Sequence, residues 1–491
     1  MLFQSYDFLI FVSLAFFLYW VLLKRNLQLQ NTFLLICSYI FYAWWNWKTL
    51  FLLVGVSLIN YFVGRKIFFN QNKKRRKIYL FIGLILNICV LSFFKYYNFF
   101  IVSFTKLINP HHNSTSLSSL KIILPLGISF YIFLSISYLI DIYKKRFKYE
   151  HNIIDVLLSL SFFPIILSGP IHRPSMLIPQ IRTKRIFNYE FAVNGCRQIL
   201  WGLITKVIIA DNIANFLNPI FSDYISYSGS TLLLGAMFYS IQIYADFSGY
   251  SNMAIGVGKL FGFRLMRNFD NPYFSKDITE FWKKWHISLT VWFRDYVFLP
   301  IAYSISKKIK NEKLLRIDSN LIIYVVGILI TWLLTGLWHG ANTTFVIWGL
   351  VHGILLIFYH SIKKTRRRVF KHLGISKNNK VLVFVERTFT LGFIGLSWVI
   401  FRSDNIQSAY TYIRKIFSLS LFTRPEVFSL KITGFVVTFF VLEFIQKKSE
   451  HALDFSNLRL SKAIRWSIYI IAVLSITMFT GNQQGFIYFQ F

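Results

Sequence analysis

The stretch that decides the fold reads LIIYVVGILITWLLTGLWHGANTTFVIWGLVHGILLIFYH and runs from Leu321 to His360. Its forty residues include no lysine, arginine, aspartate or glutamate. Basic segments flank it on both sides, Lys307 to Arg316 before it and Lys363 to Lys371 after it. Because basic flanks face the cytoplasm, the stretch should be a hairpin of two helices of about eighteen residues that turns at Gly340 to Asn342.

His339 lies at the tip of this predicted hairpin, within the sequence Thr335-Gly336-Leu337-Trp338-His339-Gly340-Ala341-Asn342. Helices of this length nearly reach the outer interface, so His339 is expected to face a cavity open to the outside. Gly340 would let substrate or backbone approach closely. Ionisable side chains in membrane segments are often functional, but a core histidine bonded to backbone and a neighbour is the structural alternative.

The composition of the whole chain is that of a membrane protein. Of its 491 residues, 55% are hydrophobic, 19% aromatic and 15% charged, and the mean hydropathy is +0.51. These values exclude a soluble globular domain. Apolar runs recur from Tyr6 to Leu23 onward, and we expect an all-α, polytopic protein with about eleven to fourteen membrane segments. No linker or repeat divides the chain, which favours a single membrane domain over residues 1–491.

The net charge of +34 is distributed over alternate loops. Cations gather at Lys24 and Arg25, at Lys73 to Lys77 and at Lys144 to Lys148, whereas the loop from Thr105 to Lys121 holds few. This alternation follows the positive-inside rule, so these basic loops are cytoplasmic, against lipid headgroups, and the N-terminus is outside. Nucleic-acid binding is a remote alternative, because no basic face with interleaved aromatics remains.

Two regions depart from plain membrane-spanning helices. Ser161 to Gln180 opens on SFFPIILSGPIHRP, which holds three prolines and a glycine. We expect a re-entrant or broken element that lines a protein-enclosed central cavity. Asp277 to Pro300 reads instead as one amphipathic helix along the membrane surface or over a polar cavity, with His286 on the border between its faces. The polar face comprises Asp277, Glu280, Lys283, Lys284, Thr290, Arg294 and Asp295, and the apolar face Phe281, Trp282, Trp285, Leu289, Trp292, Phe293 and Tyr296.

Asp246 ends another apolar run, in Tyr244-Ala245-Asp246-Phe247-Ser248-Gly249-Tyr250. It is either a hydrogen-bonded helix cap or a carboxylate that holds a group of the cavity in place. The other histidines have plainer interpretations. His172 could orient a loop, His352 and His360 are structural or interfacial, and His111 and His112 lie in an outer loop.

The sequence has no Gly-rich phosphate loop, no Cys/His metal cluster and no Gly-x-Ser-x-Gly motif. These absences argue against an ATP-driven pump, a metalloprotease and a serine hydrolase, and we expect no metal. What remains is histidine chemistry. A histidine in a water-poor cavity suits general-base catalysis, in which it takes a proton from a hydroxyl that attacks a thioester or ester carbonyl.

Several motifs, in order, resemble the membrane-bound O-acyltransferase family, most of all its bacterial polysaccharide branch, which carries out alginate O-acetylation. They are Asp246 to Gly256, Ile278 to Leu289, Trp292 to Tyr296, Gly336 to Ala341, Ser397 to Arg402 and Phe486 to Phe491. The resemblance implies that His339 is catalytic and that His286 is a second functional position. It also implies a tunnel between a cytoplasmic acyl donor and an outer acceptor. Within or beside these motifs, the residues expected to support the histidines are Asp246, Ser248, Trp338, Asn342, Arg294 and Asp295.

The resemblance further implies a multi-pass protein of the bacterial inner membrane that moves acetyl groups for O-acetylation of an extracytoplasmic glycan, an exopolysaccharide or peptidoglycan. The expected donor is acetyl-CoA or another acyl thioester, with no tightly bound cofactor, and a periplasmic acetyltransferase partner is expected. Two alternatives stay open. One is D-alanyl transfer to teichoic acid from a carrier protein, which the basic loops would also suit. The other is a proton-coupled transporter or flippase.

Overall fold

The computed structural model describes residues 1–101, 123–147, 152–309, 311–314, 317–376, 379–456, 458 and 460–489. The chain forms two compact units. One comprises Met1–Leu200 and Tyr250–Met266, and the other Trp201–Gly249 and Arg267–Phe491. The single domain expected from the sequence stays a prediction. His111 and His112, in the predicted outer loop, lie outside the described residues.

The first unit consists of helices joined by loops, with no strand among its described residues. Polar side chains cap several of its helices at the N-terminal end: Asn46 accepts from the backbone N–H of Lys48, and Asn72 accepts from that of Lys74, as is typical of N-caps. Its elements are α1 (Tyr6–Phe17), η1 (Leu18–Leu22), α2 (Leu27–Ala43), α3 (Trp47–Phe69), α4 (Lys73–Leu91), η2 (Ser92–Tyr96), α6 (Ile128–Tyr143), α7 (Ile153–Ser161), α8 (Phe163–Ile166) and α9 (Pro174–Arg182), followed by most of α10 (Tyr189–Leu203).

The proline-rich region of this unit is broken, as its sequence predicts. Helix α7 ends at Ser161, one turn of helix follows as α8, and α9 begins only at Pro174. In the extended part between them, His172 is buried, and its Nδ1 accepts from the backbone N–H of Met266 at 3.2 Å. His172 therefore orients a neighbouring loop, as expected.

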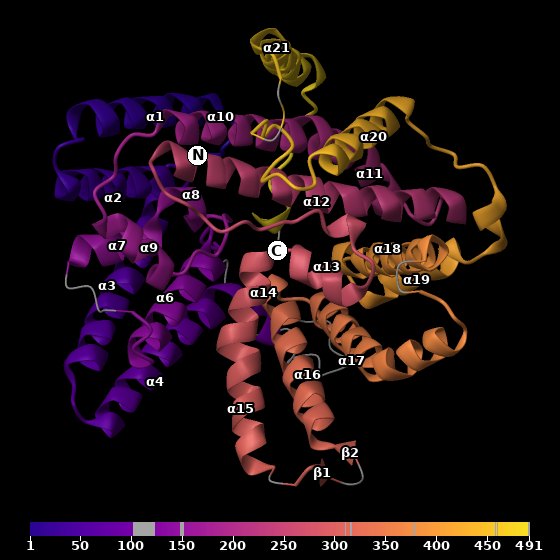
Figure 1. Ribbon diagram of the computed structural model, residues 1–491, viewed down its shortest axis with the longest axis horizontal. Helices are drawn as coiled ribbons and strands as arrows, with labels where there is room; N and C mark the ends of the chain where they lie inside the picture. The colour runs from indigo at the N-terminus through magenta and orange to yellow at the C-terminus, as the bar shows by residue number, and fades with distance from the viewer. Residues whose placement is uncertain are drawn as a thin grey trace. The chain divides into compact units, whose positions relative to one another are not determined.

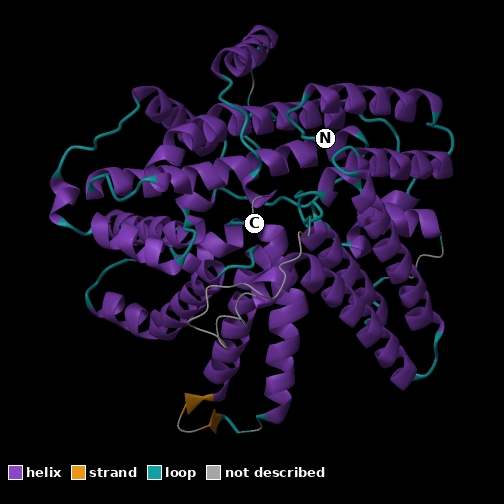
Figure 2. Cartoon of the chain, turned by 180° about the vertical axis from the view of Figure 1, so that it is seen from behind, coloured by secondary structure: helices purple, strands orange, loops and turns teal. Residues whose placement is uncertain are grey.

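The second unit contains the predicted hairpin and most of the candidate residues. Its elements are η3 (Ile204–Ala210), α11 (Asp211–Ser222), the first part of α12 (Gly229–Leu260), η4 (Pro272–Phe274), α13 (Ile278–Lys284), α14 (Ile287–Phe293), η5 (Arg294–Phe298), α15 (Leu299–Lys308), β1 (Lys313–Leu314), β2 (Ile317–Asp318), α16 (Ser319–His339), α17 (Thr343–His372), α18 (Lys380–Arg402), α19 (Ile406–Ile416), η6 (Leu419–Phe422), α20 (Leu430–Ile445), α21 (Lys462–Phe479) and η7 (Ile487–Phe489). The two short strands pair antiparallel and join α15 to α16, as seen from the front in Figure 1 and from behind in Figure 2.

Helices α16 and α17 are the two arms of the predicted hairpin, with the turn where the sequence places it. Glycines let the two helices approach so closely that the backbone of each contacts the other. A Cβ atom added at Gly349 would lie 2.3 Å from the carbonyl oxygen of Trp332, and one at Gly336 would lie 2.3 Å from that of Phe345. At the tip, the ring of Phe345 fills the space beside Gly340, so the group that approaches this glycine is a side chain rather than backbone.

The prediction of a single amphipathic helix over Asp277 to Pro300 is wrong, because the helix is interrupted at His286. This residue has the left-handed values φ 42° and ψ 54° and separates α13 from α14. The backbone on either side of it bonds to an earlier loop: Asp270 N–H donates to the Lys284 carbonyl at 3.0 Å, and Ile287 N–H donates to the Asn268 carbonyl at 2.8 Å. These distant partners replace helical hydrogen bonds. The predicted apolar face is nevertheless buried throughout.

The predicted class, an all-α polytopic membrane protein, is confirmed. Among the described residues, seven helices are long and apolar enough to cross a membrane, and three shorter apolar helices accompany them. The seven are Trp47–Phe69, Lys73–Ile101, Tyr189–Ser222, Ser319–His339, Thr343–His372, Lys380–Arg402 and Lys462–Phe479.

Replacing Gly349 with alanine should destabilise the hairpin. The added Cβ meets a backbone carbonyl at 2.3 Å, so the helices must separate, at a cost of about 1–3 kcal/mol. Thermal unfolding of the purified protein in detergent measures the loss. Gly434→Ala is the matched control, because a Cβ there meets nothing within 4 Å and alanine favours helix by up to about 1 kcal/mol. Equal melting temperatures for the two variants would contradict the close packing.

Candidate functional site

His339 is the last residue of α16 and is 5% exposed. Four aromatic rings surround its imidazole. The ring centroids lie at 4.9 Å from Trp338, 5.1 Å from Trp348, 5.3 Å from Phe401 and 5.6 Å from Tyr488. Rings this close leave little room for water. The imidazole therefore lies in a medium of low polarity, where its interactions with charge are strengthened.

His286 occupies the left-handed turn between α13 and α14 and is 1% exposed. Its Nδ1 lies 2.9 Å from Oδ1 of Asn268, and the same oxygen accepts the hydroxyl of Ser288 at 2.9 Å and its backbone N–H at 3.4 Å. Because that oxygen is an acceptor, Nδ1 of His286 must carry the proton. The lone pair is therefore on Nε2, which is buried and has no hydrogen-bond partner among the described residues.

The structure brings the two histidines together around shared aromatic rings. The Trp338 ring lies 6.1 Å from His286, and the Tyr488 ring lies 6.3 Å from it. Both rings also contact His339. Phe247 closes the other side of His286 at 4.6 Å and packs against Tyr488 at 4.4 Å. The buried hydroxyl of Tyr488 has no hydrogen-bond partner in the part of the chain described.

Asp246 fixes the C-terminal segment that carries Tyr488. It is buried in α12, and its Oδ2 accepts the backbone N–H of Ile487 at 2.7 Å. Its other oxygen lies 2.7 Å from Nζ of Lys206. Of the two interpretations given for Asp246, this geometry corresponds to a carboxylate that holds a neighbouring group. That group is the backbone next to Tyr488.

Lys206 binds Asp246 and so helps to hold the C-terminal segment. This residue was not identified as a candidate from the sequence. Its side chain is 1% exposed, and its Nζ lies 2.8 Å from Asp211, 2.7 Å from Asp246 and 3.1 Å from the carbonyl of Gln484. These three oxygens match the three protons of the ammonium group. Its position in the apolar run Ile204–Ala210 could have identified it. An ionisable residue in such a run is uncommon and usually paired.

The remaining predicted residues have different positions. Asn342 caps α17, and its Nδ2 donates to the carbonyl of Asp404 at 2.7 Å, which ties the hairpin tip to the segment after α18. Ser248 is buried in α12. Arg294 and Asp295 form an ion pair with each other at 2.7 Å. This pair is not part of the ring contacts that connect the two histidines.

The two imidazoles of the site are groups that can accept and donate protons. Within the described residues, no group of three or more histidine, cysteine, aspartate or glutamate side chains could hold a metal ion. Burial lowers the pKa of His286 to about 3, so this imidazole is neutral at physiological pH and accepts hydrogen bonds through Nε2.

The chain is thus a helical membrane protein with two buried histidines beside shared aromatic rings. Residues 85–389 match the model of MBOAT, the membrane-bound O-acyltransferase family, and the chain belongs to this family. It is therefore an O-acyltransferase.

Curated relatives cover most of the chain. It is 36% identical to the probable alginate O-acetylase of Pseudomonas aeruginosa, over 91% of this chain and 80% of that protein. It is 30% identical to the peptidoglycan O-acetyltransferase of Helicobacter pylori, over 98% of this chain and 95% of that protein. It is 31% identical to the teichoic acid D-alanyltransferase of Bacillus subtilis, in an alignment that covers 60% of this chain and 71% of that protein.

Lys206→Met should release the C-terminal segment. Removing the ammonium leaves two buried carboxylates uncompensated, which costs about 3–5 kcal/mol of stability. Thermal unfolding in detergent measures the loss. The control is Lys431→Met, because that lysine is exposed and lies over the rings of Phe435 and Phe479, and its removal should change stability by less than about 1 kcal/mol. Similar losses in both variants would show that Lys206 is no anchor.

Asn268→Asp should make activity sensitive to acid. In the wild-type protein the low pKa of His286 keeps Nε2 unprotonated between about pH 5 and 8. A carboxylate 2.9 Å from Nδ1 stabilises the imidazolium and raises that pKa, so activity falls as the pH drops through the new value. The rate of acyl transfer against pH, measured in membrane vesicles, tests this.

Asn268→Ala is the uncharged control for this experiment. It removes the acceptor of the Nδ1 proton without adding charge, so it should lower activity at every pH and add no acid limb. A pH profile of Asn268→Asp that overlays the wild-type profile would disprove the assignment of the lone pair on His286.

Proposed function

We propose that this protein moves acetyl groups across the bacterial inner membrane for O-acetylation of an extracytoplasmic polysaccharide, an exopolysaccharide or peptidoglycan, with acetyl-CoA or another cytoplasmic acyl thioester as the donor. The observation that carries the proposal is the pair of buried histidines, His339 and His286, which share the rings of Trp338 and Tyr488. The names of the relatives that match over most of the chain, an alginate O-acetylase and a peptidoglycan O-acetyltransferase, support acetyl as the group transferred.

In the proposed reaction, His339 is the general base. It takes the proton of the acceptor hydroxyl as that oxygen attacks the thioester carbonyl, and it returns the proton to the leaving thiolate. One ester bond forms and one thioester bond breaks, with no net proton released. The same residue could instead carry the acyl group transiently on its imidazole. The acceptor hydroxyl has one proton, which goes to His339, so Nε2 of His286 accepts a hydrogen bond from another donor group of the bound substrates and orients them. This atom is buried and has no protein partner among the described residues.

The supporting residues act through position. Asp246 and Lys206 hold the segment of Tyr488, and the ring of Trp338 lies beside both imidazoles. Asn342 fixes the hairpin tip. The aromatic rings around His339 exclude water, which protects a thioester from hydrolysis while the acceptor enters. The proposal includes a periplasmic partner protein as the carrier of the acetyl group to the polysaccharide.

The alternative of D-alanyl transfer has less support. The D-alanyltransferase of Bacillus subtilis matches 60% of this chain, whereas the peptidoglycan O-acetyltransferase matches 98%. Membership in an acyltransferase family also argues against a transporter or flippase.

His339→Gln should abolish acetylation of the envelope polysaccharide, because the glutamine side chain cannot take up the proton. Acetate released by mild base from envelope glycans measures the activity, in cells that carry the variant as their sole copy. We expect a loss of at least about 100-fold with an unchanged amount of protein in the membrane.

The matched control is His352→Gln. His352 is a fully buried histidine on the other arm of the same hairpin, and its Nε2 lies 3.1 Å from the hydroxyl of Ser397. This variant perturbs the core in a similar way but should retain most of the acetate. Equal acetate in His339→Gln and wild-type cells would refute the role of His339, and release of D-alanine instead of acetate would favour the alternative donor.

A further inference from the structure

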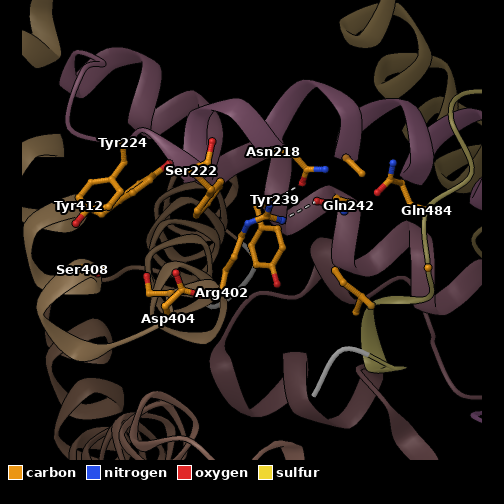
Figure 3. Close-up of a pocket in the computed structure, with 15 residues that line it drawn as sticks. Asn218, Ser222, Tyr224, Tyr239, Gln242, Arg402, Asp404, Ser408, Tyr412 and Gln484 are labelled. Atoms are coloured by element: carbon orange, nitrogen blue, oxygen red, sulfur yellow. Dashed lines mark hydrogen bonds between the residues drawn. The ribbon is translucent and has the colours of Figure 1, made fainter. Parts of the chain in front are cut away.

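Each of the two units has a cavity with an arginine in its wall, and the two arginines differ in what binds the guanidinium. In the second unit, Arg402 donates to Oδ1 of Asn218 at 2.8 Å and to Oε1 of Gln242 at 3.4 Å. Figure 3 shows this guanidinium directed toward the two amides. In the first unit, the exposed side chain of Arg264 lies over an aromatic ring and has no hydrogen-bond acceptor and no ion pair among the described residues. The N–H groups of Arg264 are therefore available to an acceptor from outside the protein.

The cavity around Arg264 is small and basic. It has a volume of about 170 Å³ and lies between η1, the loop that joins α9 to α10, the start of α10 and the end of α12. Its wall combines three aromatic rings with two cations and has no acidic side chain. The rings are those of Trp20, Phe187 and Phe191, and the cations are Lys259 and Arg264. Glu190, the acidic neighbour of Phe191 in the sequence, is exposed and does not line the cavity.

The two cations share one aromatic ring. Nζ of Lys259 lies 5.9 Å from the ring centroid of Phe191, and Cζ of Arg264 lies 5.5 Å from the same centroid. Lys259 is 6% exposed and donates to Oδ1 of Asn194 at 2.6 Å. Gly262, with φ 85°, forms the left-handed turn between the two cations, a conformation that glycine adopts readily. Like charges this close repel each other, and an anion bound beside both reduces that repulsion.

Hydrogen bonds to the backbone fix the wall of the cavity. The backbone N–H and carbonyl of Arg264 bond to the side-chain amide of Gln180 at 2.8 and 3.1 Å. The indole N–H of Trp20 donates at 2.8 Å to the last carbonyl of α12. Asn188 accepts the backbone N–H of Phe191 at 2.9 Å through Oδ1. A wall that is already fixed loses little conformational freedom when a ligand binds.

The charge pattern places this cavity at the cytoplasmic surface of the membrane. Trp20 is in η1, and Lys24 and Arg25 follow directly after that element. If these cations are cytoplasmic, as the sequence predicts, the cavity lies at the level of the inner-leaflet headgroups. Two apolar side chains of the wall are turned outward here, since Ile186 is 82% exposed and Phe187 is 45% exposed. Apolar side chains exposed at this level are suited to contact with lipid chains.

We propose that this cavity binds the phosphate of an anionic phospholipid of the inner leaflet. Arg264 binds the phosphate oxygens, because the guanidinium fork matches their geometry, and Lys259 adds its charge beside them. Ile186 and Phe187 lie along the acyl chains. The volume suits a headgroup phosphate, since sites that enclose a whole small ligand are typically about 300–1,000 Å³. The inference goes beyond the proposed function, because no step of that function uses this cavity.

The test measures lipid binding to the purified full-length protein in detergent by native mass spectrometry. One probe is phosphatidylglycerol, which is anionic, and the other is phosphatidylcholine with the same acyl chains, which has a phosphate but no net charge. The wild-type protein should bind phosphatidylglycerol at least about tenfold more tightly. Arg264→Gln should lose most of this preference. Arg367→Gln is the matched control, because Arg367 is an exposed arginine in the basic part of α17, and it should keep the preference.

Soluble phosphate compounds are the other source of the same chemistry, and competition distinguishes them. Glycerol 1-phosphate has the phosphate without acyl chains, and coenzyme A has several phosphates on a soluble molecule. At concentrations equal to that of the lipid, neither should displace phosphatidylglycerol from the wild-type protein. Displacement by either compound would indicate a site for soluble phosphates and would overturn the assignment to a lipid.

Two further outcomes would overturn the inference. They are equal affinities of the wild-type protein for the two lipids, and a preference in Arg264→Gln as large as that in Arg367→Gln. If Arg264→Gln folds poorly, thermal unfolding of the wild-type protein decides. Phosphatidylglycerol should raise the melting temperature more than phosphatidylcholine does, because a ligand of the folded state stabilises it, and equal shifts would contradict the site. His339→Gln should bind phosphatidylglycerol as the wild type does, so failure of the proposed acetyl transfer is distinguishable from failure of this inference.

Discussion

The structure of the candidate site depends on the buried ammonium group of Lys206. A lysine that is 1% exposed is tolerable only if every proton of its ammonium has a partner, and the three oxygens around it come from Asp211, Asp246 and the backbone of Gln484. Asp211 starts α11, Asp246 is in α12, and Gln484 is in the C-terminal segment. The single charge of Lys206 thus connects α11, α12 and the C-terminal segment. The C-terminal segment is placed by this ion cluster together with the ring contacts of Phe486 and Tyr488.

The wall of the histidine site follows from that placement. Tyr488 contacts both His339 and His286. The second constraint is local and acts at His286. Its left-handed backbone conformation is uncommon for a residue with a side chain and is stable only where its surroundings enforce it. Here the hydrogen bonds to Asn268 do so, and the same bonds fix which ring nitrogen carries the proton.

The sequence predicted the features that depend on local composition. The hairpin from Leu321 to His360 followed from the absence of charge between basic flanks, and the broken element at Ser161 to Gln180 followed from its prolines. The break at His286 could not be predicted, because residues 277–300 have helical periodicity throughout, and the competing hydrogen bonds come from Asn268, eighteen residues earlier. The clustering of Lys206, Asp246 and Tyr488 was equally inaccessible. Their contacts join residues up to 278 positions apart in the sequence, and no local pattern encodes such pairing.

In the proposed reaction, deprotonating a hydroxyl beside a thioester requires the exclusion of water, since water would compete as the acceptor. The four aromatic rings around His339, those of Trp338, Trp348, Phe401 and Tyr488, suit this requirement. Tyr488 lies next to the backbone N–H that Asp246 binds, and Asp246 is itself bound by Lys206. The buried ion cluster and the water-poor surroundings of His339 are therefore parts of one arrangement, because the loss of the charge would also displace a ring of the histidine site.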